Sequence, residues 1–431
     1  IFRSNPTIVG PTGTPPEGGS APGVWTLEQA SYYTKLGVWP QRIIPRALYG
    51  WGSNSRGQLG QNDKVYRSSP VQIGALSDWS TVYGNQDSTV AIKSNGTIWS
   101  WGENNDGQLG QNDRVVRSSP VQIGALTNWL TGFGGRAFNV AVKTDGTMWA
   151  WGGNTNGQLG QIDRVNRSSP VQVGAATDWY SVSCGNQHVL AIKTNGTLWS
   201  WGYNTNGQLG QNDTVTRSSP VQIGALTNWS KVACGYSFSA ASKTDGTLWL
   251  VGNNSYGQLG QNDRVYRSSP VQVGVLTNWS TLAAGPAFTV SIKTNGTLWE
   301  WGQNNDGNLG QNDKVYRSSP VQVGTLTNWA TANTNSVSLN LVVATKTDGS
   351  LWTWGVNANG QIGDNSLSYR SSPVQIGALT TWTSGAFAGN ATFALNAPSL
   401  EASNLWTWGV NGYGAVGQND TINYSSPVQV S

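Results

Sequence analysis

Few residues of this chain could carry out acid–base, nucleophilic or metal chemistry. His188 is the only histidine among 431 residues, and Cys184 and Cys234 are the only cysteines. A Ser/His/Asp or Cys/His arrangement would have to use His188, and a zinc site would need several Cys or His ligands at short spacing. We therefore expect no catalytic residue, no metal and no cofactor. His188 is interpreted as a polar loop residue, and the cysteines as small buried thiols on inner strands, with a disulfide or a reactive pair as the alternative.

The segment Gly-Gln-Asn-Asp, first seen at residues 60–63, recurs along the chain and offers oxygen ligands that could suggest calcium. It lacks the alternating acidic residues of a dedicated calcium loop. Asn62 and Asp63 are instead expected to bond to nearby backbone amides, and Arg67 is expected to pair with Asp63, as such side chains do in turns. The segment is therefore predicted to have a structural role.

The composition excludes several classes of protein. Hydrophobic residues make up 37% of the chain and charged residues 11%, against about 25% charged in an ordinary soluble domain. With 55 glycines and 23 tryptophans, the chain favours many turns and bulky core residues over long helices. No window reaches the ~18 apolar residues of a membrane helix, so no membrane insertion is expected. The net charge of +4 is spread along the chain, so no nucleic-acid partner is expected either.

A repeat of about 50 residues organises most of the chain. A Trp-Gly pair, or Val-Gly in one copy, recurs along the sequence, and a Ser-Ser-Pro-Val-Gln segment follows each pair. The pairs begin at Trp51, Trp101, Trp151, Trp201, Val251, Trp301, Trp354 and Trp408. A fixed period of this length indicates a repeat architecture in which each copy is one structural unit.

Each copy is predicted to contain four short strands. In the second copy these are residues 79–83, 89–93, 97–101 and 121–123. Asn95-Gly96 predicts a type I′ hairpin turn between the second and third strands. Trp99 and Trp101 are two residues apart, so their rings project to the same side of the sheet, where we expect packing between neighbouring sheets; a sugar-stacking platform is the alternative. A single unit cannot bury both faces, and radial stacking of the units would give a β-propeller.

The string from Trp101 to Gly110, followed by a proline-bearing strand, resembles the repeat of the regulator of chromosome condensation family. The resemblance covers residues 47–431 and implies an all-β fold, a seven-bladed β-propeller of four-stranded blades. Eight Trp-Gly halves but only seven inner halves are present, which makes seven and a half blades. We expect a ring of seven with residues 47–76 as an added edge. In the alternative, residues 1–46 or another chain complete an eighth blade.

Residues 1–46 are predicted to form an arm outside the propeller. Residues 1–23 are rich in proline and glycine, which is typical of an extended tether. A capping box that begins at Thr26 predicts a short helix to about Leu36. The stretch 23–40 resembles a segment of phage structural and fibre proteins, notably marine ones, which implies a docking arm on a larger particle. Its candidate anchor residues are Trp25, Leu27, Tyr32, Tyr33, Leu36 and Trp39.

The loop between the first two strands varies most among the copies, whereas the framework is nearly constant. In a propeller these loops share one end of the central channel, so they are predicted to form a partner-binding face. Neutral drift is the alternative explanation of their variety. The candidate face residues are Gln86, Asp87, Arg136, Phe138, Gln187, His188, Tyr236, Phe238 and Phe288.

These patterns predict a non-enzymatic structural or adhesion component of a virus (phage) particle, located in the virion. Its expected partners are other virion proteins, bound through residues 1–46, and a host-surface protein or glycan on the propeller face. The family resemblance implies an alternative, a cytoplasmic or secreted protein–protein interaction module that regulates a partner or inhibits an enzyme. A carbohydrate-binding propeller is the third hypothesis.

Overall fold

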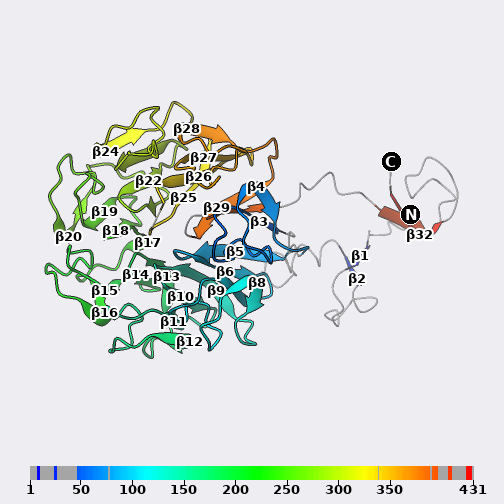
Figure 1. Cartoon of the computed structure of the whole chain (residues 1–431), viewed down its shortest axis with the longest axis horizontal. Helices are drawn as coiled ribbons and strands as arrows, with labels where there is room; N and C mark the ends of the chain where they lie inside the picture. Colours follow the sequence, from blue (N-terminus) through cyan, green and yellow to red (C-terminus); the bar gives the residue numbers. More distant parts are fainter. Residues whose placement is uncertain are drawn as a thin grey trace. The chain divides into compact units, whose positions relative to one another are not determined.

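Four-stranded antiparallel sheets are arranged as blades around a central channel (Figure 1). The structure is a computed structural model, and it describes residues 7–9, 24–26, 46–75, 78–337, 339–388, 391–396, 406–409 and 424–429. The chain divides into two units, residues 1–44 and 45–431. Within the described ranges, all secondary-structure elements are β-strands. These ranges contain no helix long and apolar enough to cross a membrane.

Blade one shows how a repeat becomes a sheet. It contains β5 (Trp79–Gly84), β6 (Ser88–Lys93), β7 (Ile98–Gly102) and β8 (Arg117–Gln122), each antiparallel to the next. Every residue of β6 is buried, because neighbouring blades cover both faces of the sheet. The predicted strands are confirmed, although the fourth begins earlier, at Arg117.

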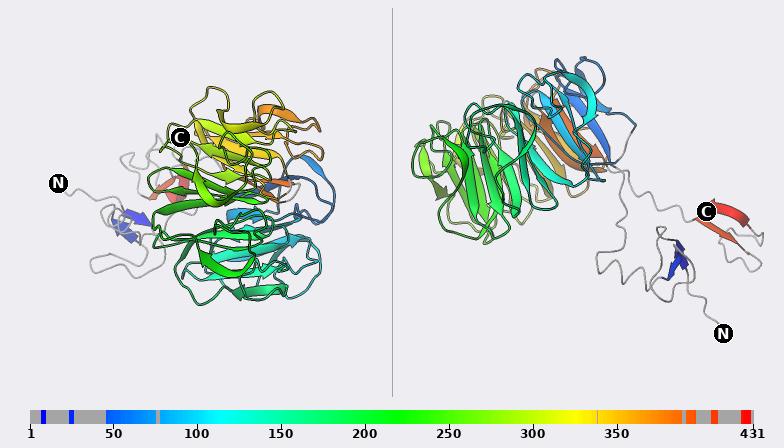
Figure 2. Two further views of the ribbon diagram at one scale, coloured as in Figure 1. Left: turned by 90° about the vertical axis from the view of Figure 1, so that its left-hand side faces the viewer. Right: turned by 90° about the horizontal axis from the view of Figure 1, so that it is seen from below.

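Blades two to six repeat this order, and Figure 2 shows neighbouring blades packed face to face. Blade two contains β9 (Trp129–Gly134), β10 (Phe138–Lys143), β11 (Met148–Gly152) and β12 (Arg167–Gln172). Blade three contains β13 (Trp179–Cys184), β14 (His188–Lys193), β15 (Leu198–Gly202) and β16 (Arg217–Gln222). Blade four contains β17 (Trp229–Cys234), β18 (Phe238–Lys243), β19 (Leu248–Gly252) and β20 (Arg267–Gln272). Blade five contains β21 (Ala283–Ala284), β22 (Phe288–Ile292), β23 (Leu298–Gly302) and β24 (Arg317–Gln322). Blade six contains β25 (Trp329–Thr334), β26 (Leu341–Lys346), β27 (Leu351–Gly355) and β28 (Arg370–Gln375).

Blade seven combines strands from both ends of the propeller sequence, and so closes the ring. Its strands, in order across the sheet, are β29 (Trp382–Ala388), β30 (Ala391–Asn396), β3 (Ala47–Gly52) and β4 (Arg67–Gln72). β3 is antiparallel to β30, with Gly50 opposite Phe393, and β29 contacts β5 of blade one. The fold is therefore the predicted seven-bladed propeller of four-stranded blades.

The expectation that residues 47–76 form an added edge is wrong. Their strands β3 and β4 are the outer half of blade seven, because the edge of β30 is free to pair with β3. The half left over is the last one, β31 (Trp406–Gly409) and β32 (Tyr424–Gln429), which pair with each other in a separate two-stranded sheet. The described strands thus form seven four-stranded blades and no eighth.

The hairpin between the second and third strands is confirmed, but its turn is not the predicted type I′. Gly96 has a φ of 77°, whereas Asn95 is not among the residues with positive φ. The Gly96 N–H donates to Lys93 O at 2.9 Å, which gives a type I turn followed by a glycine bulge. The Asn95 side chain favours this geometry, because its Oδ1 accepts hydrogen bonds from Thr97 N at 3.1 Å and Thr97 Oγ1 at 2.8 Å.

Tryptophans fill the space between blades. Trp101 is fully buried, and its Nε1 donates to Gln58 O of blade seven at 2.8 Å. Trp79 meets both tryptophans of its own blade, with ring centroids 6.3 Å from Trp99 and 6.0 Å from Trp101. Trp99 is half-buried, and Lys93 Nζ lies 4.5 Å from its ring centroid. The predicted packing between neighbouring sheets is therefore confirmed for the Trp101 position.

In the smaller unit, β1 (Thr7–Val9) pairs antiparallel with β2 (Val24–Thr26), with Ile8 opposite Trp25. The predicted helix after Thr26 lies outside the described residues. So do the remaining predicted anchor residues, Leu27, Tyr32, Tyr33, Leu36 and Trp39.

Candidate functional site

The two ends of the ring carry different loops. One end, called here the loop face, carries the loops between the first and second strands and between the third and fourth strands of each blade. In blade one these two loops touch, because the Glu103 N–H donates to Asp87 O at 2.9 Å. The opposite end, called the hairpin face, carries tight turns such as residues 93–97 and the links between blades. The predicted partner-binding face corresponds to the inner part of the loop face.

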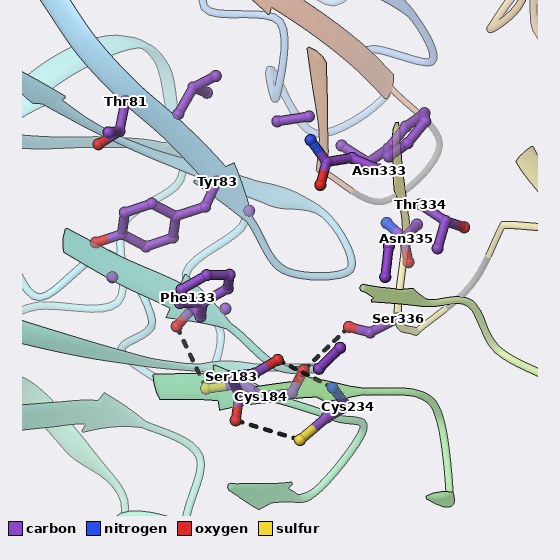
Figure 3. Close-up of a pocket in the computed structure, with 18 of the residues that line it drawn as sticks. Thr81, Tyr83, Phe133, Ser183, Cys184, Cys234, Asn333, Thr334, Asn335 and Ser336 are labelled. Carbon is purple, nitrogen blue, oxygen red and sulfur yellow. Dashed lines mark hydrogen bonds between the residues drawn. The ribbon is translucent and has the colours of Figure 1, made fainter. Parts of the chain in front are cut away.

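The central channel contains a cavity of about 350 Å³. Its lining comes from the first strand of all seven blades, and none of the lining side chains is charged. Figure 3 shows Tyr83 and Phe133 on one side of this cavity and Asn333 and Thr334 on another. The propeller therefore offers both a surface of loops and an internal cavity of neutral side chains.

Cys184 and Cys234 lie on the channel-lining strands β13 and β17 as free, buried thiols. This confirms the prediction of small buried thiols, and the alternative of a disulfide is wrong. Cys184 Sγ lies 3.5 Å from Phe133 O, and Cys234 Sγ lies 3.3 Å from Ser183 O. Burial raises the pKa of Cys234 to about 12, so its thiol stays protonated at neutral pH.

Backbone hydrogen bonds join the inner loops of five successive blades around the channel. Each N–H donates to a carbonyl of the next blade at 3.1 to 3.3 Å: Gln86 to Arg136, Arg136 to Asn186, Asn186 to Tyr236 and Tyr236 to Pro286. These bonds brace the loops against one another. Side chains at the mouth of the channel are therefore held on a rigid support, as binding residues on loops of a stable scaffold usually are.

Four of the nine predicted face residues are wrong, because they are buried. Phe138, Phe238 and Phe288 are 0% exposed and His188 is 1% exposed. Each is the first residue of the second strand of its blade, and Phe138 packs in a core cluster between blades. The Phe138 ring also lies against Gly135, where a Cβ atom would approach it to 2.0 Å. These side chains pack in the core next to the inner loops. They are not part of the surface that a partner could contact at the loop face.

His188 is a neutral core residue, not the predicted polar loop residue. It takes the place that phenylalanine has in blades two, four and five, and its Nε2 lies 3.0 Å from Ser239 Oγ. Burial lowers the pKa of His188 to about 4. The only imidazole of the chain is therefore uncharged at neutral pH and shielded from solvent.

The other five predicted face residues reach the surface. Arg136 and Tyr236 are exposed, whereas Gln86, Asp87 and Gln187 are partly exposed. Arg136 Nε donates to Gln86 Oε1 at 3.0 Å, across the boundary between blades one and two. Burial, followed by the negative charge of a neighbouring glutamate, raises the pKa of Asp87 to about 6. The loop face over these blades therefore carries a charge that changes close to neutral pH.

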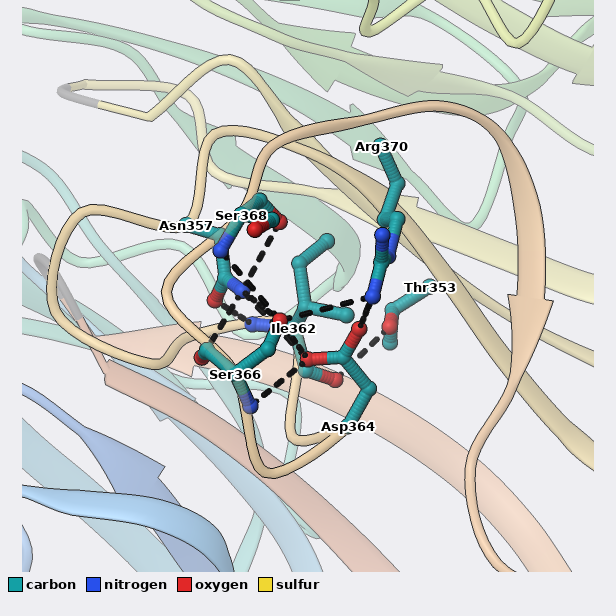
Figure 4. Close-up of polar contacts among 7 residues, drawn as sticks. All are labelled: Thr353, Asn357, Ile362, Asp364, Ser366, Ser368 and Arg370. Carbon is teal, nitrogen blue, oxygen red and sulfur yellow. Dashed lines mark hydrogen bonds and ion pairs between the residues drawn. The ribbon is translucent and has the colours of Figure 1, made fainter.

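A repeated network of polar side chains holds the outer loops of the loop face. In blade six, Asn357 Oδ1 accepts a hydrogen bond from the Ile362 N–H at 2.8 Å (Figure 4). Arg370 Nε donates to Asp364 Oδ2 at 2.8 Å, and Thr353 Oγ1 donates to Ile362 O at 2.7 Å. Side chains thus satisfy backbone groups that no strand partner reaches, which fixes a long loop without regular structure.

The predicted pairing of Asp63 with Arg67 is confirmed in blade seven, where Asp63 Oδ2 and Arg67 Nη2 are 2.6 Å apart. Asp63 Oδ1 also accepts the Val65 N–H at 2.9 Å, as predicted for a turn aspartate. Asn62 adopts a left-handed φ of 61°, and its N–H donates to Ser118 O of the next blade at 2.8 Å. The recurring segment is therefore a structural loop that also links neighbouring blades.

Sequence reasoning missed a group of tyrosines on the outer loops of blades four and five. The rings of Tyr256 and Tyr316 meet edge to face with centroids 5.5 Å apart, and the Arg264 guanidinium lies 5.9 Å from the Tyr316 ring. Tyr266 OH lies 2.6 Å from Ser255 Oγ. Tyrosine and arginine are enriched at protein interfaces. The signal was visible, since Tyr256 stands where the other six blades have arginine, aspartate or asparagine; the last copy also has tyrosine there, at Tyr413.

Two further observations concern residues that could take part in catalysis. They contain no group of three or more His, Cys, Asp or Glu side chains that could hold a metal ion. Glu300 is fully buried between blades, and burial raises its pKa well above the usual value. Trp354 Nε1 donates to Glu300 Oε2 at 3.3 Å. This carboxyl group is therefore packed in the core, away from any surface or cavity that a substrate could reach.

The seven four-stranded sheets around a central channel, with loops joined by hydrogen bonds at one end, define a β-propeller. The sequence matches the Regulator of chromosome condensation (RCC1) repeat over residues 47–92, 95–142, 145–192, 195–242, 245–292, 295–333 and 348–395. A second form of the same repeat matches residues 81–108, 179–208 and 229–258. The chain belongs to the RCC1 repeat family, as the resemblance indicated.

Solved structures share this fold. Yeast RCC1 (Prp20) in a complex with Kap60 is similar with a TM-score of 0.74 and 18% identity, over 82% of this chain and 89% of that chain. Prp20p of Saccharomyces cerevisiae, described with its binding properties to Gsp1p and histones, has a TM-score of 0.73 and 18% identity, over 82% and 92%. Human WBSCR16 has a TM-score of 0.73 and 20% identity, over 82% and 100%. A comparison with curated protein sequences finds no match.

Proposed function

We propose that this chain is a non-enzymatic interaction module that binds a protein partner through its loop face. Membership of the RCC1 repeat family supports this role. Yeast RCC1, which shares the fold, is seen in a complex with Kap60, and Prp20p is described with binding to Gsp1p and histones. The observation that carries the proposal is the juxtaposition of braced inner loops and exposed tyrosines on one face of the ring.

The loop face combines the side chains that dominate protein interfaces. Tyr236 and Tyr256 both lie on loops of blade four at this face, and they are 38% and 36% exposed. Tyr316 and Arg264 extend this aromatic group toward blade five. A rigid tyrosine loses little conformational entropy on binding, and a tyrosine or arginine at the centre of an interface contributes about 2 kcal/mol or more. Arg136 adds a charged contact over blade two.

The test compares two pairs of substitutions on opposite faces. The first pair, Tyr256→Ala with Tyr316→Ala, removes the aromatic group of the loop face. The matched control, Leu126→Ala with Leu226→Ala, removes side chains that are each 50% exposed on the hairpin face. Binding of purified histones and of a Gsp1p-type protein is measured by biolayer interferometry for the natural chain and both variants.

We expect at least one of these partners to bind, and its affinity to fall about tenfold or more for the tyrosine variant only. Circular dichroism would show that both variants keep the propeller. Equal losses for both variants, or no binding of either protein to the natural chain, would contradict the proposal.

A structural role in a virion is a second proposal, favoured by the phage-like sequence of residues 23–40. Residues 1–46 would attach the chain to other virion proteins, and the loop face would contact a protein or glycan of the host surface. Deletion of residues 1–46 is then expected to abolish incorporation into the particle while the propeller still folds. Normal incorporation of the shortened chain would contradict this role.

A further inference from the structure

The channel cavity has an uneven wall. Tyr83 and Phe133, from blades one and two, stack with ring centroids 6.3 Å apart and planes at 28°. At the same position of the first strand, blades four, five and seven have alanine, at Ala233, Ala283 and Ala386. Tyr83 is 7% exposed and packs behind Phe133, so it is the Phe133 ring that faces small side chains across the channel, and the space in front of this ring is not filled by the protein.

Phe133 is unusual among the phenylalanines of the propeller. It is 39% exposed, whereas Phe138, Phe238 and Phe288 are fully buried. It lies on the wall of the cavity, so the exposed part of the ring faces the channel. Covering this surface with an apolar ring would be favourable, because it removes apolar area from water.

Asn333 provides a directed polar group in the same cavity. Its Nδ2 donates to Gly385 O of the next blade at 2.9 Å, which fixes the orientation of the amide. The Oδ1 atom is then left as an acceptor on the cavity side (Figure 3). No charged side chain lines the cavity, so a charged ligand would lose its hydration without a compensating partner.

A loop that is longer in blade six than in blades one to five reaches across one end of the cavity. The loop after β25 is longer than its counterparts in blades one to five, and Ser336 Oγ from this loop donates to Cys184 O of blade three at 3.1 Å. Blades three and six lie on opposite sides of a ring of seven, so the loop crosses the channel at the loop face. The lining continues to Ser80 and Ser384 near the starts of their strands, so the cavity extends toward the hairpin face.

We propose that this channel is a binding site for a small, uncharged, planar ring compound that carries a hydrogen-bond donor. The ring of the ligand stacks on Phe133, and its donor bonds to Asn333 Oδ1. The cavity of about 350 Å³ accommodates one or two fused rings, but not a folded partner. This site is separate from the loop-face surface, so either proposal can fail without the other.

The experiment uses the full chain and three probes of nearly equal shape. Indole is planar and uncharged and has an N–H donor; benzofuran has the same shape without the donor; indole-3-carboxylate carries a charge. Binding is measured by ligand-observed saturation-transfer NMR and by isothermal titration calorimetry. We expect indole to bind with a Kd between about 10 μM and 1 mM, benzofuran about tenfold more weakly, and the carboxylate not measurably.

Two variants locate the site. Phe133→Ala is expected to weaken indole and benzofuran alike by about tenfold or more, because it removes the stacking surface. Asn333→Leu is expected to weaken indole only, so that the two probes bind equally. Leu130→Ala is the control, since Leu130 lies on the same strand as Phe133 but outside the cavity and is 54% exposed.

The thermal midpoint of each variant shows whether it folds, and Phe133→Leu replaces Phe133→Ala if the latter does not. Failure of all probes to bind would overturn the proposal. Equal binding of indole and benzofuran to the natural chain, or binding that neither channel variant changes, would overturn it as well.

Discussion

The first and the last outer half-blades of this chain carry the same repeat motif, but only the first pairs with β30 and completes its sheet. β3 pairs with β4, and β31 pairs with β32, with the same shift of register. They differ in the residue at the position that faces Phe393. In β3 this residue is Gly50, and the corresponding residue of β31 is Thr407. A Cβ atom on Gly50 would lie 2.9 Å from Phe393 Cε1. The two halves thus share the repeat motif but differ in the residue that would contact Phe393 when the ring closes.

The same pair of positions recurs in every blade, and in most blades a larger residue faces a smaller one. Phe393 faces Gly50 in blade seven, and Leu250 faces Ala240 in blade four. The other pairs are Ser100 with Val90, Ala150 with Val140, Ser200 with Leu190, Glu300 with Val290 and Thr353 with Val343. Close packing constrains the pair, not either residue alone. The repeat motif therefore defines a blade, and the paired residues decide which halves fit together.

The largest expected effect comes from a substitution that gives β3 the residue found at the same position of β31. Gly50→Thr is expected to lower the free energy of unfolding by about 3 kcal/mol, because the new side chain overlaps the Phe393 ring. Adding Phe393→Val should recover at least half of this loss, since blade six already accommodates Thr353 opposite Val343. Urea unfolding followed by tryptophan fluorescence measures both effects.

Ser100→Thr in blade one is the matched control for this substitution. Ser100 lies opposite Val90, so an added methyl group meets the same partner as in blade six, and the cost should stay below about 1 kcal/mol. If Phe393→Val restores no stability to the Gly50→Thr chain, then the contact between these positions does not select the closing half.

A second prediction concerns the same position in blade five, where a carboxyl group takes the place of serine. Burial raises the pKa of Glu300 well above its usual value of 4.5, so the folded protein favours the protonated form. The associated stability is fully present below the unfolded pKa and is lost as the pH rises toward the folded pKa. Glu300→Gln is therefore expected to raise the free energy of unfolding by about 2 kcal/mol at pH 8 and by almost nothing at pH 4.

Unfolding of the natural chain and of Glu300→Gln at both pH values checks this expectation. Glu103→Gln, on the loop face, serves as the control because its side chain is in contact with solvent. A gain for Glu300→Gln that is the same at pH 4 and pH 8 would mean that the charge of Glu300 is not its cause.

The sequence predicted the repeat and the seven blades but not which half closes the ring. The period of the Trp-Gly pairs is a property of each copy, whereas closure depends on Gly50 and Phe393, which are far apart in the chain. The burial of Phe138 and His188 was missed because the second strand begins at these residues, one position before the predicted start. The type I turn was missed because the side chain of Asn95, not its backbone preference, decides the geometry.

A third prediction tests a polar contact that the leftover half has lost. Arg117 bonds to Val115 O at 2.8 Å and to Asp113 at 2.6 Å, whereas Tyr424 stands at the corresponding position of the last copy. Arg117→Tyr is expected to cost about 1 kcal/mol, a modest value because both partners are partly exposed. Arg114→Ala is the control, since Arg114 is exposed on the same loop.

The loss should also depend on pH. The Val115 N–H, and after it the Arg117 guanidinium, lower the pKa of Asp113 below its usual value of 3.8. Stability from this group is present above that value and is lost as the pH falls through the folded pKa. The cost of Arg117→Tyr, measured by urea unfolding, should therefore be larger at pH 7 than at pH 3. An equal cost at both pH values would show that the ion pair contributes nothing.

The smallest expected effect concerns a left-handed backbone conformation in the outer loops, which one blade adopts with an unsuitable residue. The loops of six blades have asparagine in the left-handed region at this position, such as Asn112 with a φ of 62°, but blade two has Ile162 with a φ of 66°. A β-branched residue is strained there, and Ile162 gains little from packing because it is 82% exposed. Ile162→Asn is therefore expected to stabilise the chain by about 0.5–1 kcal/mol.

The reverse substitution in blade one makes this prediction sharper. Asn112→Ile places the same strain in an equivalent loop, so it should cost about as much as Ile162→Asn gains, and the double variant should be close to the natural chain in stability. Since residues 107–115 and 157–165 differ only at this position, the cycle separates backbone strain from side-chain contacts. If the two changes do not cancel, blade two holds Ile162 by contacts that the other loops lack, and the seven loops are not equivalent at that position.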